Sequence, residues 1–345
     1  MKSVRHCPPT GSDAPAGGEK KITAKQPGIL DASENLVGPV TRGDPESSLR
    51  RTCKSTYRLR DELLLQGYSV SQSRVCKLPA ELGYGLRSPR KTGEGGEHPD
   101  RDAQFMYIDG QVRRFRDIGL PVISVDTKKK ENIGNYANRG REYRPKGRPE
   151  RVKVYDFVDK TLGKVSPYGI YDISRNEGFV NVGISYDTAE FAVSSIRAWW
   201  YEMGQPAYPK ATGLLITADG GGSNGSGVRL WKTELQKLAD ELSLDIHVCH
   251  FPPGTGKWNK TEHKMFCHIS KNWRGRPLVS RETVVRLISS TTTKAGLRIR
   301  ARLDENICEK GRKVSDKELA TVNIERGKFC GKWNYTIKSN HKIKV

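Results

Sequence analysis

Residues 214–225 read Leu-Leu-Ile-Thr-Ala-Asp-Gly-Gly-Gly-Ser-Asn-Gly, an apolar run that ends at Asp219 and a glycine-rich loop. A short apolar run bounded by glycines is typical of a buried strand. A helical pattern follows at 229–242, a second strand-like run at 246–249 and another helical stretch at 261–272. This order of strand, helix, strand and helix predicts an α/β sheet.

The residues before this stretch extend the same pattern. Strand-like runs lie at 122–125, 168–173 and 179–184, and a helical stretch follows at 189–202. A last helical stretch covers 282–290, and there is no internal repeat. Three strands, a helix, then strand-helix-strand-helix is the element order of a ribonuclease H-like fold, a mixed central sheet flanked by helices. We therefore expect residues 104–345 to form one such domain with a basic C-terminal extension.

Three acidic residues stand where this fold could use them for chemistry. Asp126 follows the run Val-Ile-Ser-Val, Asp219 ends the strand described above, and Glu262 lies at the start of a helix. Carboxylates at the ends of adjacent strands, with a third on a nearby helix, suit two divalent metal ions that act on a phosphodiester. A single strand-end aspartate is more often a turn or cap residue, and Asp172 before a hairpin turn is an example.

Residues 250–263 read His-Phe-Pro-Pro-Gly-Thr-Gly-Lys-Trp-Asn-Lys-Thr-Glu-His. The proline-glycine turn is rigid, and it places Glu262 just inside the helix that follows. Lys257 and Lys260 precede this carboxylate, and both are candidates for contact with DNA.

The charge of the chain points to a polyanionic partner. Sixty Lys and Arg residues against 39 Asp and Glu give a formal net charge of +21 over 345 residues. Such an excess is typical of nucleic-acid binding, although a merely soluble basic protein is the alternative. The sequence has no apolar run long enough to cross a bilayer and no secretory signal, and its seven scattered cysteines include no Cys-x-x-Cys pair. We expect a cytoplasmic, nucleoid-associated protein.

The basic segment after Asp126 is the strongest candidate for phosphate contacts. It predicts a loop that holds DNA over the site, and a solvated charged surface is the alternative. Its candidate DNA-binding residues are Lys128, Lys129, Lys130, Arg139, Arg141, Arg144 and Lys146.

The N-terminal part has a different texture. We expect residues 1–42 to be a disordered, low-complexity tail with a short helix near 30–37, and residues 87–103 to be a linker. Between them, residues 43–86 predict a helix-turn-helix-like region, with Leu59, Leu63 and Leu64 on the inner side of its first helix. A second helix, capped by Ser71, would present Arg74 and Lys77 to DNA. Pro79 should kink or end that helix, and an ordinary helical hairpin is the alternative.

Two further motifs leave alternatives open. Gly220–Gly225 matches G-x-G-x-x-G, the pattern of a dinucleotide-binding fold, although the order of the strands and the positive charge disfavour that interpretation. His247, Cys249, His250, His263, Cys267 and His268 suggest zinc, but they lack the spacing of a zinc ribbon.

Several ordered strings also resemble a known family. Val122–Glu131, Leu215–Gly225, His250–Thr255 and Lys257–His263 are similar to segments of DDE transposases of the ISAzo insertion-sequence family, also known as the Rhodopirellula-type transposase DDE domain. Asn272–Leu278 and Gly331–Ile337 belong to the same pattern, and the resemblance covers roughly residues 40 to 338.

This resemblance implies a DDE triad at Asp126, Asp219 and Glu262, with two Mg²⁺ or Mn²⁺ ions in each active site. It also implies cleavage and joining of double-stranded DNA, at the terminal inverted repeats of the transposon and in the target, by a homo-oligomer. Members usually carry a further N-terminal helical segment, so a catalytically idle, N-terminally truncated DNA-binding remnant is the second hypothesis. A cellular nuclease of the same fold, acting on RNA-DNA hybrids, is the third.

Overall fold

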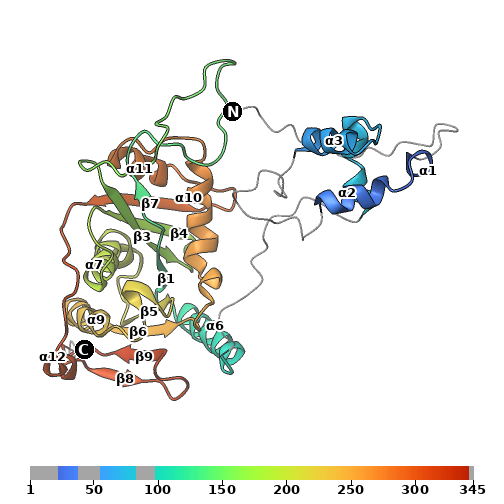
Figure 1. The fold of residues 1–345 in the computed structure, drawn as a ribbon. Coiled ribbons are helices and arrows are strands. Elements are labelled where there is room, and N and C mark those ends of the chain that lie inside the picture. Colours follow the sequence, from blue (N-terminus) through green and yellow to red (C-terminus); the bar gives the residue numbers. More distant parts are fainter. Residues whose placement is uncertain (1–21, 38–54, 83–97, 342–345) are drawn as a thin grey trace. The chain divides into compact units, whose positions relative to one another are not determined.

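The structure, a computed structural model, describes residues 22–37, 55–82 and 98–341, except for the side chains of Pro79 and Lys257. The chain divides into two compact units at residues 92 and 93. Figure 1 shows the elements of both units.

A nine-stranded mixed sheet forms the centre of the second unit, with the order β7-β4-β3-β1-β5-β6-β9-β8 and β2 paired to β3. Strand β3 pairs antiparallel with β1 and β4, whereas β1 pairs parallel with β5, and β5 parallel with β6. The strands are β1 (Val122–Thr127), β2 (Glu131–Asn132), β3 (Lys164–Asp172), β4 (Glu177–Gly183), β5 (Gly213–Ala218), β6 (Asp245–His250), β7 (Arg298–Asp304), β8 (Ile324–Arg326) and β9 (Asn334–Ile337).

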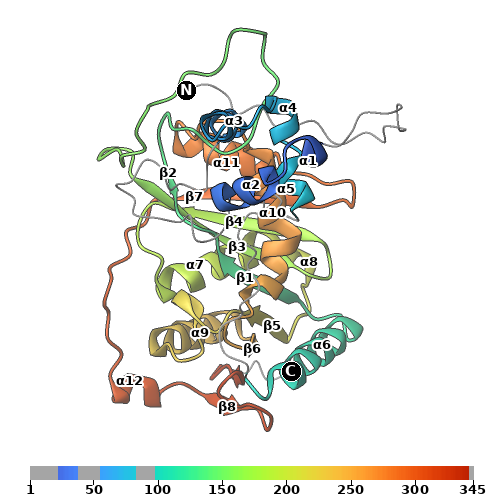
Figure 2. The same ribbon diagram turned by 45° about the vertical axis from the view of Figure 1, so that its right-hand side comes forward.

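Helices cover both faces of this sheet (Figures 1 and 2). Helices α7 (Ala189–Trp199) and α9 (Arg229–Leu242) pack on one face, where Trp199 and Trp231 are almost completely buried. Helices α6 (Arg101–Asp117), α10 (Cys267–Asn272) and α11 (Arg281–Ser289) pack on the other face. Burial of apolar side chains on both faces explains why the central strands are apolar throughout.

The predicted ribonuclease H-like architecture is confirmed as a mixed α/β sheet flanked by helices. All five predicted strands are present as β1, β3, β4, β5 and β6, and the helix predicted at 229–242 has those bounds. Two predicted helices contain π-helical turns. Trp200–Gly204 follows the α-helical part of the first, and Glu262–Phe266 precedes the α-helix Cys267–Asn272 of the second. Within residues 22–37, 55–82 and 98–341, no helix is both long enough and apolar enough to cross a membrane.

The sequence patterns missed the edges of this sheet. Strand β7 alternates charged and apolar residues over Arg298–Asp304, with charged residues at four of its seven positions, and β8 and β9 are short. Helix α6 begins at Arg101, so the segment expected to be a linker up to residue 103 ends in a helix. Its buried face is small, which made its period hard to recognise among charged residues.

The first unit contains short helices around a small apolar core. They are α1 (Ile22–Lys25), α2 (Ile29–Val37), α3 (Thr56–Leu65), α4 (Gln72–Val75) and α5 (Leu78–Glu81). Ile29 of α2 is fully buried with Leu63, Val75 and Leu78, and Gln26 exchanges two hydrogen bonds with the backbone of Ser69, at 2.7 and 3.0 Å. The short helix expected near residues 30–37 is present as α2, and Ile22–Lys25 also form a helix within the segment expected to be a disordered tail. The other residues of 1–42 lie outside the described part.

The predicted second helix of the helix-turn-helix is interrupted, as Pro79 indicated. Ser55 and Ser71 cap α3 and α4 as expected, but the second helix is divided into α4 and α5, of four residues each. Pro79 lies in the first turn of α5, where a missing backbone N–H costs no helical hydrogen bond. Leu64 is 47% exposed, so only Leu59 and Leu63 form the inner side of α3.

Candidate active site

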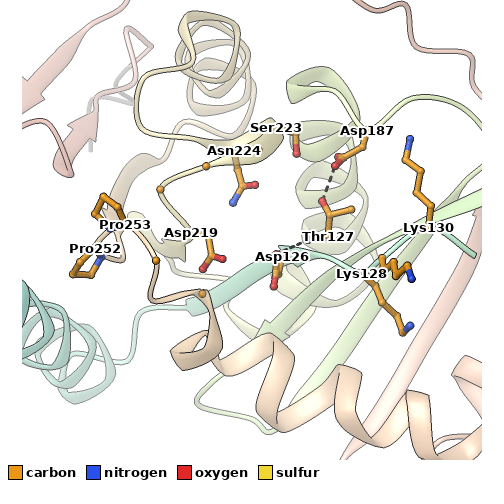
Figure 3. Close-up of a pocket in the computed structure, with 16 residues that line it drawn as sticks. Asp126, Thr127, Lys128, Lys130, Asp187, Asp219, Ser223, Asn224, Pro252 and Pro253 are labelled. Atoms are coloured by element: carbon orange, nitrogen blue, oxygen red, sulfur yellow. Dashed lines mark hydrogen bonds between the residues drawn. The ribbon is translucent and has the colours of Figure 1, made fainter. Parts of the chain in front are cut away.

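The ends of the neighbouring strands β1 and β5 position Asp126 and Asp219. The two strands run parallel with Val125 opposite Ala218, so the next residue of each strand lies at the same edge of the sheet. Asp126 and Asp219 both line a cleft of about 740 Å³, together with Asp187 and the glycine-rich loop. Figure 3 shows their carboxylates within this one cleft.

Glu262 comes from the loop and helix that follow β6. The proline-glycine turn after His250 leads through a short 3-10 turn, Gly256–Trp258, into the π-helical turn that begins at Glu262. Its side chain is exposed, and its negative charge raises the pKa of both Asp126 and Asp219. A π-helical turn is unusual and is frequent at functional sites, because it redirects one side chain relative to a regular helix.

The electrostatics of the site are those of crowded carboxylates. Burial, together with the charges of Asp219, Glu262 and Asp187, raises the pKa of Asp126 to about 8, against the opposing effect of a hydrogen bond from the Thr127 N–H. Burial also raises the pKa of Asp219, which a hydrogen bond from Asn259 opposes. Several acidic groups so close together ionise fully only beside a compensating positive charge.

Asp187, a fourth carboxylate, was missed by the sequence analysis. It lines the same cleft and accepts a hydrogen bond from the Thr127 hydroxyl at 3.2 Å. It lies in the segment between β4 and α7, just before the helix cap Thr188. Its only sequence signal is this position after a strand, which is indistinguishable from an ordinary turn residue.

The donor set suits hard divalent cations, which prefer carboxylate oxygens. In the described part of the chain, however, no three Asp, Glu, His or Cys side chains converge as ligands of a single ion. This applies to the zinc alternative, since His247 is paired with Thr336 and His250 with Asp219 and Tyr335. Asp126, Asp219 and Glu262 likewise do not converge as ligands of a single ion.

His250 holds the backbone of Asp219 through a hydrogen bond. Its Nδ1 lies 3.0 Å from the Asp219 carbonyl oxygen, and its Nε2 lies 3.0 Å from the Tyr335 hydroxyl. The carbonyl can only accept, so Nδ1 carries the proton and Nε2 accepts from Tyr335, which in turn accepts from Trp231. Complete burial lowers the pKa of His250 to about 4, which keeps the imidazole neutral.

The glycine-rich loop lines the cleft beside Asp219. Gly222 has a φ of +72°, which favours glycine, and Gly222–Asn224 forms a 3-10 turn. The dinucleotide alternative is wrong, because such folds have a largely parallel sheet and here β3 runs antiparallel between β1 and β4.

The candidate DNA-binding residues differ in their exposure to solvent and in whether they are paired with a carboxylate. Lys128 is largely buried, since its ammonium pairs with Glu131 at 2.7 Å and lies 4.4 Å from the centre of the Trp273 ring. Arg144 pairs with Glu142 and Glu150, and Arg74 pairs with Glu81. The side chain of Lys257 lies outside the described residues. The exposed candidates outside these ion pairs are Lys77, Lys129, Lys130, Arg139, Arg141, Lys146 and Lys260.

A comparison with models of known protein families identifies the family of this chain. The model of the Rhodopirellula transposase DDE domain matches residues 32–339. The chain belongs to this family. It is a transposase-type protein, and the match includes every candidate residue of the site.

Solved structures of the Mos1 transposase are similar at low identity. The Mos1 paired-end complex with the left transposon end is 13% identical, with a TM-score of 0.41, covering 80% of this chain and 72% of that one. The Mos1 strand transfer complex is 12% identical with a TM-score of 0.40 over the same shares. Among curated proteins, no sequence matches the chain.

Proposed function

We propose that this transposase cuts and joins DNA at transposon ends with Asp126, Asp219 and Glu262 as its catalytic carboxylates. The observation that carries the proposal is the position of Asp126 and Asp219 at the ends of two parallel, hydrogen-bonded strands that open into one cleft. Glu262 acts electrostatically on both aspartates from the facing helix. Membership of the transposase family supports the same assignment.

Carboxylate oxygens are the ligands that Mg²⁺ and Mn²⁺ prefer, and Asp126, Asp219 and Glu262 would together hold two such ions. When bound, divalent ions activate the attacking hydroxyl and stabilise the departing oxygen of a phosphodiester. The pairing of β1 with β5 fixes the positions of Asp126 and Asp219, and the helical turn after β6 supplies Glu262. The cation would also offset the burial and the carboxylate repulsion that together raise the pKa of Asp126.

Double-stranded DNA is the proposed substrate, bound as transposon ends and as target. Lys129 and Lys130 line the cleft beside the aspartates, so they can hold a phosphate backbone at the site. Arg139 and Arg141 are exposed further along the same loop. Contacts of this kind orient DNA without reading its sequence. A homo-oligomer that holds two ends together is part of the same proposal.

A cleavage assay on a duplex that contains both transposon ends, with Mn²⁺ or Mg²⁺, tests this function. Asp126→Asn, Asp219→Asn and Glu262→Gln should each abolish cleavage and leave DNA binding nearly intact, because each removes one ligand charge at constant volume. Asp172→Asn is the matched control. Asp172 also follows a strand, but it accepts hydrogen bonds from the Ser174 and Arg175 N–H groups and from Tyr208, away from the cleft. Wild-type cleavage by any of the three variants would refute the triad.

The same assay separates the alternative, a catalytically idle DNA-binding remnant. An idle remnant would retain binding to end-containing DNA but would show no metal-dependent cleavage in the unmodified chain.

A further inference from the structure

Asn259 is a buried amide that makes four hydrogen bonds. One is to the Asp219 carboxylate, and two others are to the residues that precede Asp126 and Glu262 in the chain. Asn259 lies three residues before Glu262, and its side chain is completely inaccessible to solvent. The Nδ2 group donates to the Val125 carbonyl at 2.9 Å and to the Asp219 carboxylate at 3.2 Å. The Oδ1 atom accepts from the Ser124 hydroxyl at 2.6 Å and from the Thr261 N–H at 3.1 Å.

The partners fix the orientation of this amide. The Val125 carbonyl can only accept and the Thr261 N–H can only donate, so Nδ2 and Oδ1 cannot exchange places. Both amide hydrogens and both oxygen lone pairs are used, so Asn259 has no capacity left for substrate or water. A buried amide with every hydrogen bond satisfied holds its neighbours in one arrangement.

Each partner is adjacent to a candidate catalytic residue or is one itself. Val125 immediately precedes Asp126 in β1, and Thr261 immediately precedes Glu262. Asp219 is contacted directly. Ser124 and Thr261 are also fully buried, and the Thr261 hydroxyl donates to the Ser124 carbonyl at 2.6 Å. The three residues Ser124, Asn259 and Thr261 are called the polar hub below.

Gly256 constrains the same aspartate from the other side. A Cβ atom at this position would collide with the second carboxylate oxygen of Asp219. The backbone of Gly256 does not have a positive φ, so its conformation does not require glycine. An added methyl group would act only by taking the space of the carboxylate. Asn259 and Gly256 therefore leave the Asp219 carboxylate little freedom to rotate.

We propose that Asn259 is a positioning residue that aligns Asp126, Asp219 and Glu262 through the polar hub. It touches no substrate and acts through the three carboxylates. The inference rests on the proposed function, because it assumes that these carboxylates do the chemistry. Misplacing a catalytic group by about 1 Å costs on the order of 100-fold in rate, and loss of a residue that orients a metal ligand costs roughly 10–100-fold in affinity or activity.

Substitutions within the polar hub provide graded tests. Asn259→Ala removes all four hydrogen bonds, and we expect a roughly 100-fold loss of cleavage. Asn259→Asp keeps the acceptor but replaces the donor toward Asp219 with a carboxylate oxygen, so its loss should be at least as large. Ser124→Ala and Thr261→Val each remove one hydroxyl and leave the amide donors to Val125 and Asp219, so we expect losses of less than about tenfold.

Asn181→Ala is the matched control for the cost of losing a buried amide. Asn181 is also fully buried in the sheet, where it donates to Ser195 at 3.0 Å and to Asp304 at 2.7 Å, and none of its partners lines the cleft. This variant should lose thermal stability as Asn259→Ala does, yet it should cleave DNA at close to the wild-type rate per folded molecule.

Two measurements decide the proposal on the full-length protein. The first is Mn²⁺ binding without DNA, followed by calorimetry, where Asn259→Ala and Gly256→Ala should bind roughly 10–100-fold more weakly than wild type and Asn181→Ala should not. The second is cleavage, where added Mn²⁺ should partly rescue Asn259→Ala and Gly256→Ala. Wild-type Mn²⁺ affinity and cleavage in Asn259→Ala, while the three carboxylate variants are inactive, would overturn the positioning role alone. Cleavage that survives loss of the carboxylates would instead overturn the proposed function.

Discussion

The hydroxyl group of Thr127 donates a hydrogen bond to the carboxylate of Asp187, 3.2 Å away. Thr127 ends β1 directly after Asp126, so this bond attaches a fourth carboxylate to the strand that carries the first (Figure 3). The charge of Asp187 is one of the causes that raise the pKa of Asp126. Asp187 therefore adds negative charge to the cleft without being one of the three proposed catalytic carboxylates.

The first prediction concerns this fourth carboxylate. Asp187→Asn should cleave DNA within about tenfold of the wild-type rate but should require more Mn²⁺, because it weakens the field that attracts the cation without removing a proposed ligand. A titration of cleavage against Mn²⁺ concentration measures both quantities. Asp172→Asn serves as the control. Complete loss of cleavage in Asp187→Asn would place Asp187 among the essential carboxylates.

The second prediction concerns the basic loop. Changing Lys129, Lys130, Arg139 and Arg141 to Ala should reduce the slope of log K against log salt by roughly 3–4, since each lost phosphate contact contributes about 0.9. Fluorescence anisotropy on a labelled duplex at several salt concentrations measures this slope.

A control variant with the same change in net charge tests whether position matters. Alanine at four basic residues that are paired with carboxylates elsewhere should leave the slope nearly unchanged. These residues are Arg197, Arg229, Arg302 and Lys338. Equal slopes for the two quadruple variants would mean that the loop is only a solvated surface.

The third prediction is a loss of stability in acid caused by His250. Its pKa falls from the ordinary 6.5 to about 4 in the folded protein. The unfolded chain therefore binds a proton between these two values while the folded protein does not. The stabilisation is fully present above pH 6.5 and is lost as the pH falls toward 4, by an amount on the order of 2–4 kcal/mol.

Replacing this imidazole should make the stability less dependent on pH. His250→Gln should have a lower Tm than wild type at pH 7, but its Tm should fall less steeply between pH 6.5 and 4. Differential scanning fluorimetry over this range tests the difference, with His263→Gln at an exposed position as control. Parallel curves for His250→Gln and wild type would show that His250 does not cause the acid sensitivity.

The fourth prediction concerns the N-terminal helical unit. Leu63 is 1% exposed in its core, whereas the adjacent Leu64 is 47% exposed. Leu63→Ala should destabilise the unit by about 2–5 kcal/mol, because it leaves a cavity among Ile29, Val75 and Leu78. Leu64→Ala should be nearly neutral. Hydrogen exchange of residues 22–37 and 55–82 in the full chain measures the effect, and equal protection in the two variants would contradict this core.

The strands that carry Asp126 and Asp219 were predictable, because central strands buried on both faces are continuous apolar runs. Strand β7 was not, since an edge strand that alternates charged and apolar residues resembles a loop in a basic chain. Pro79 predicted an interruption of the second helix in the N-terminal unit, and the structure divides that helix into α4 and α5.

The sequence by itself determined the α/β class, the strand-end aspartates and the helix-borne glutamate, because local apolar periodicity and turn residues specify them. Only the tertiary structure decided that Asp187 joins the cleft, that Lys128 is occupied by Glu131 and Trp273, and that Asn259 connects to Val125 and Asp219. Asn259 reaches Val125 across 134 positions and Asp219 across 40. Contacts over such distances depend on how strands and helices pack together, and no local pattern in the chain encodes them.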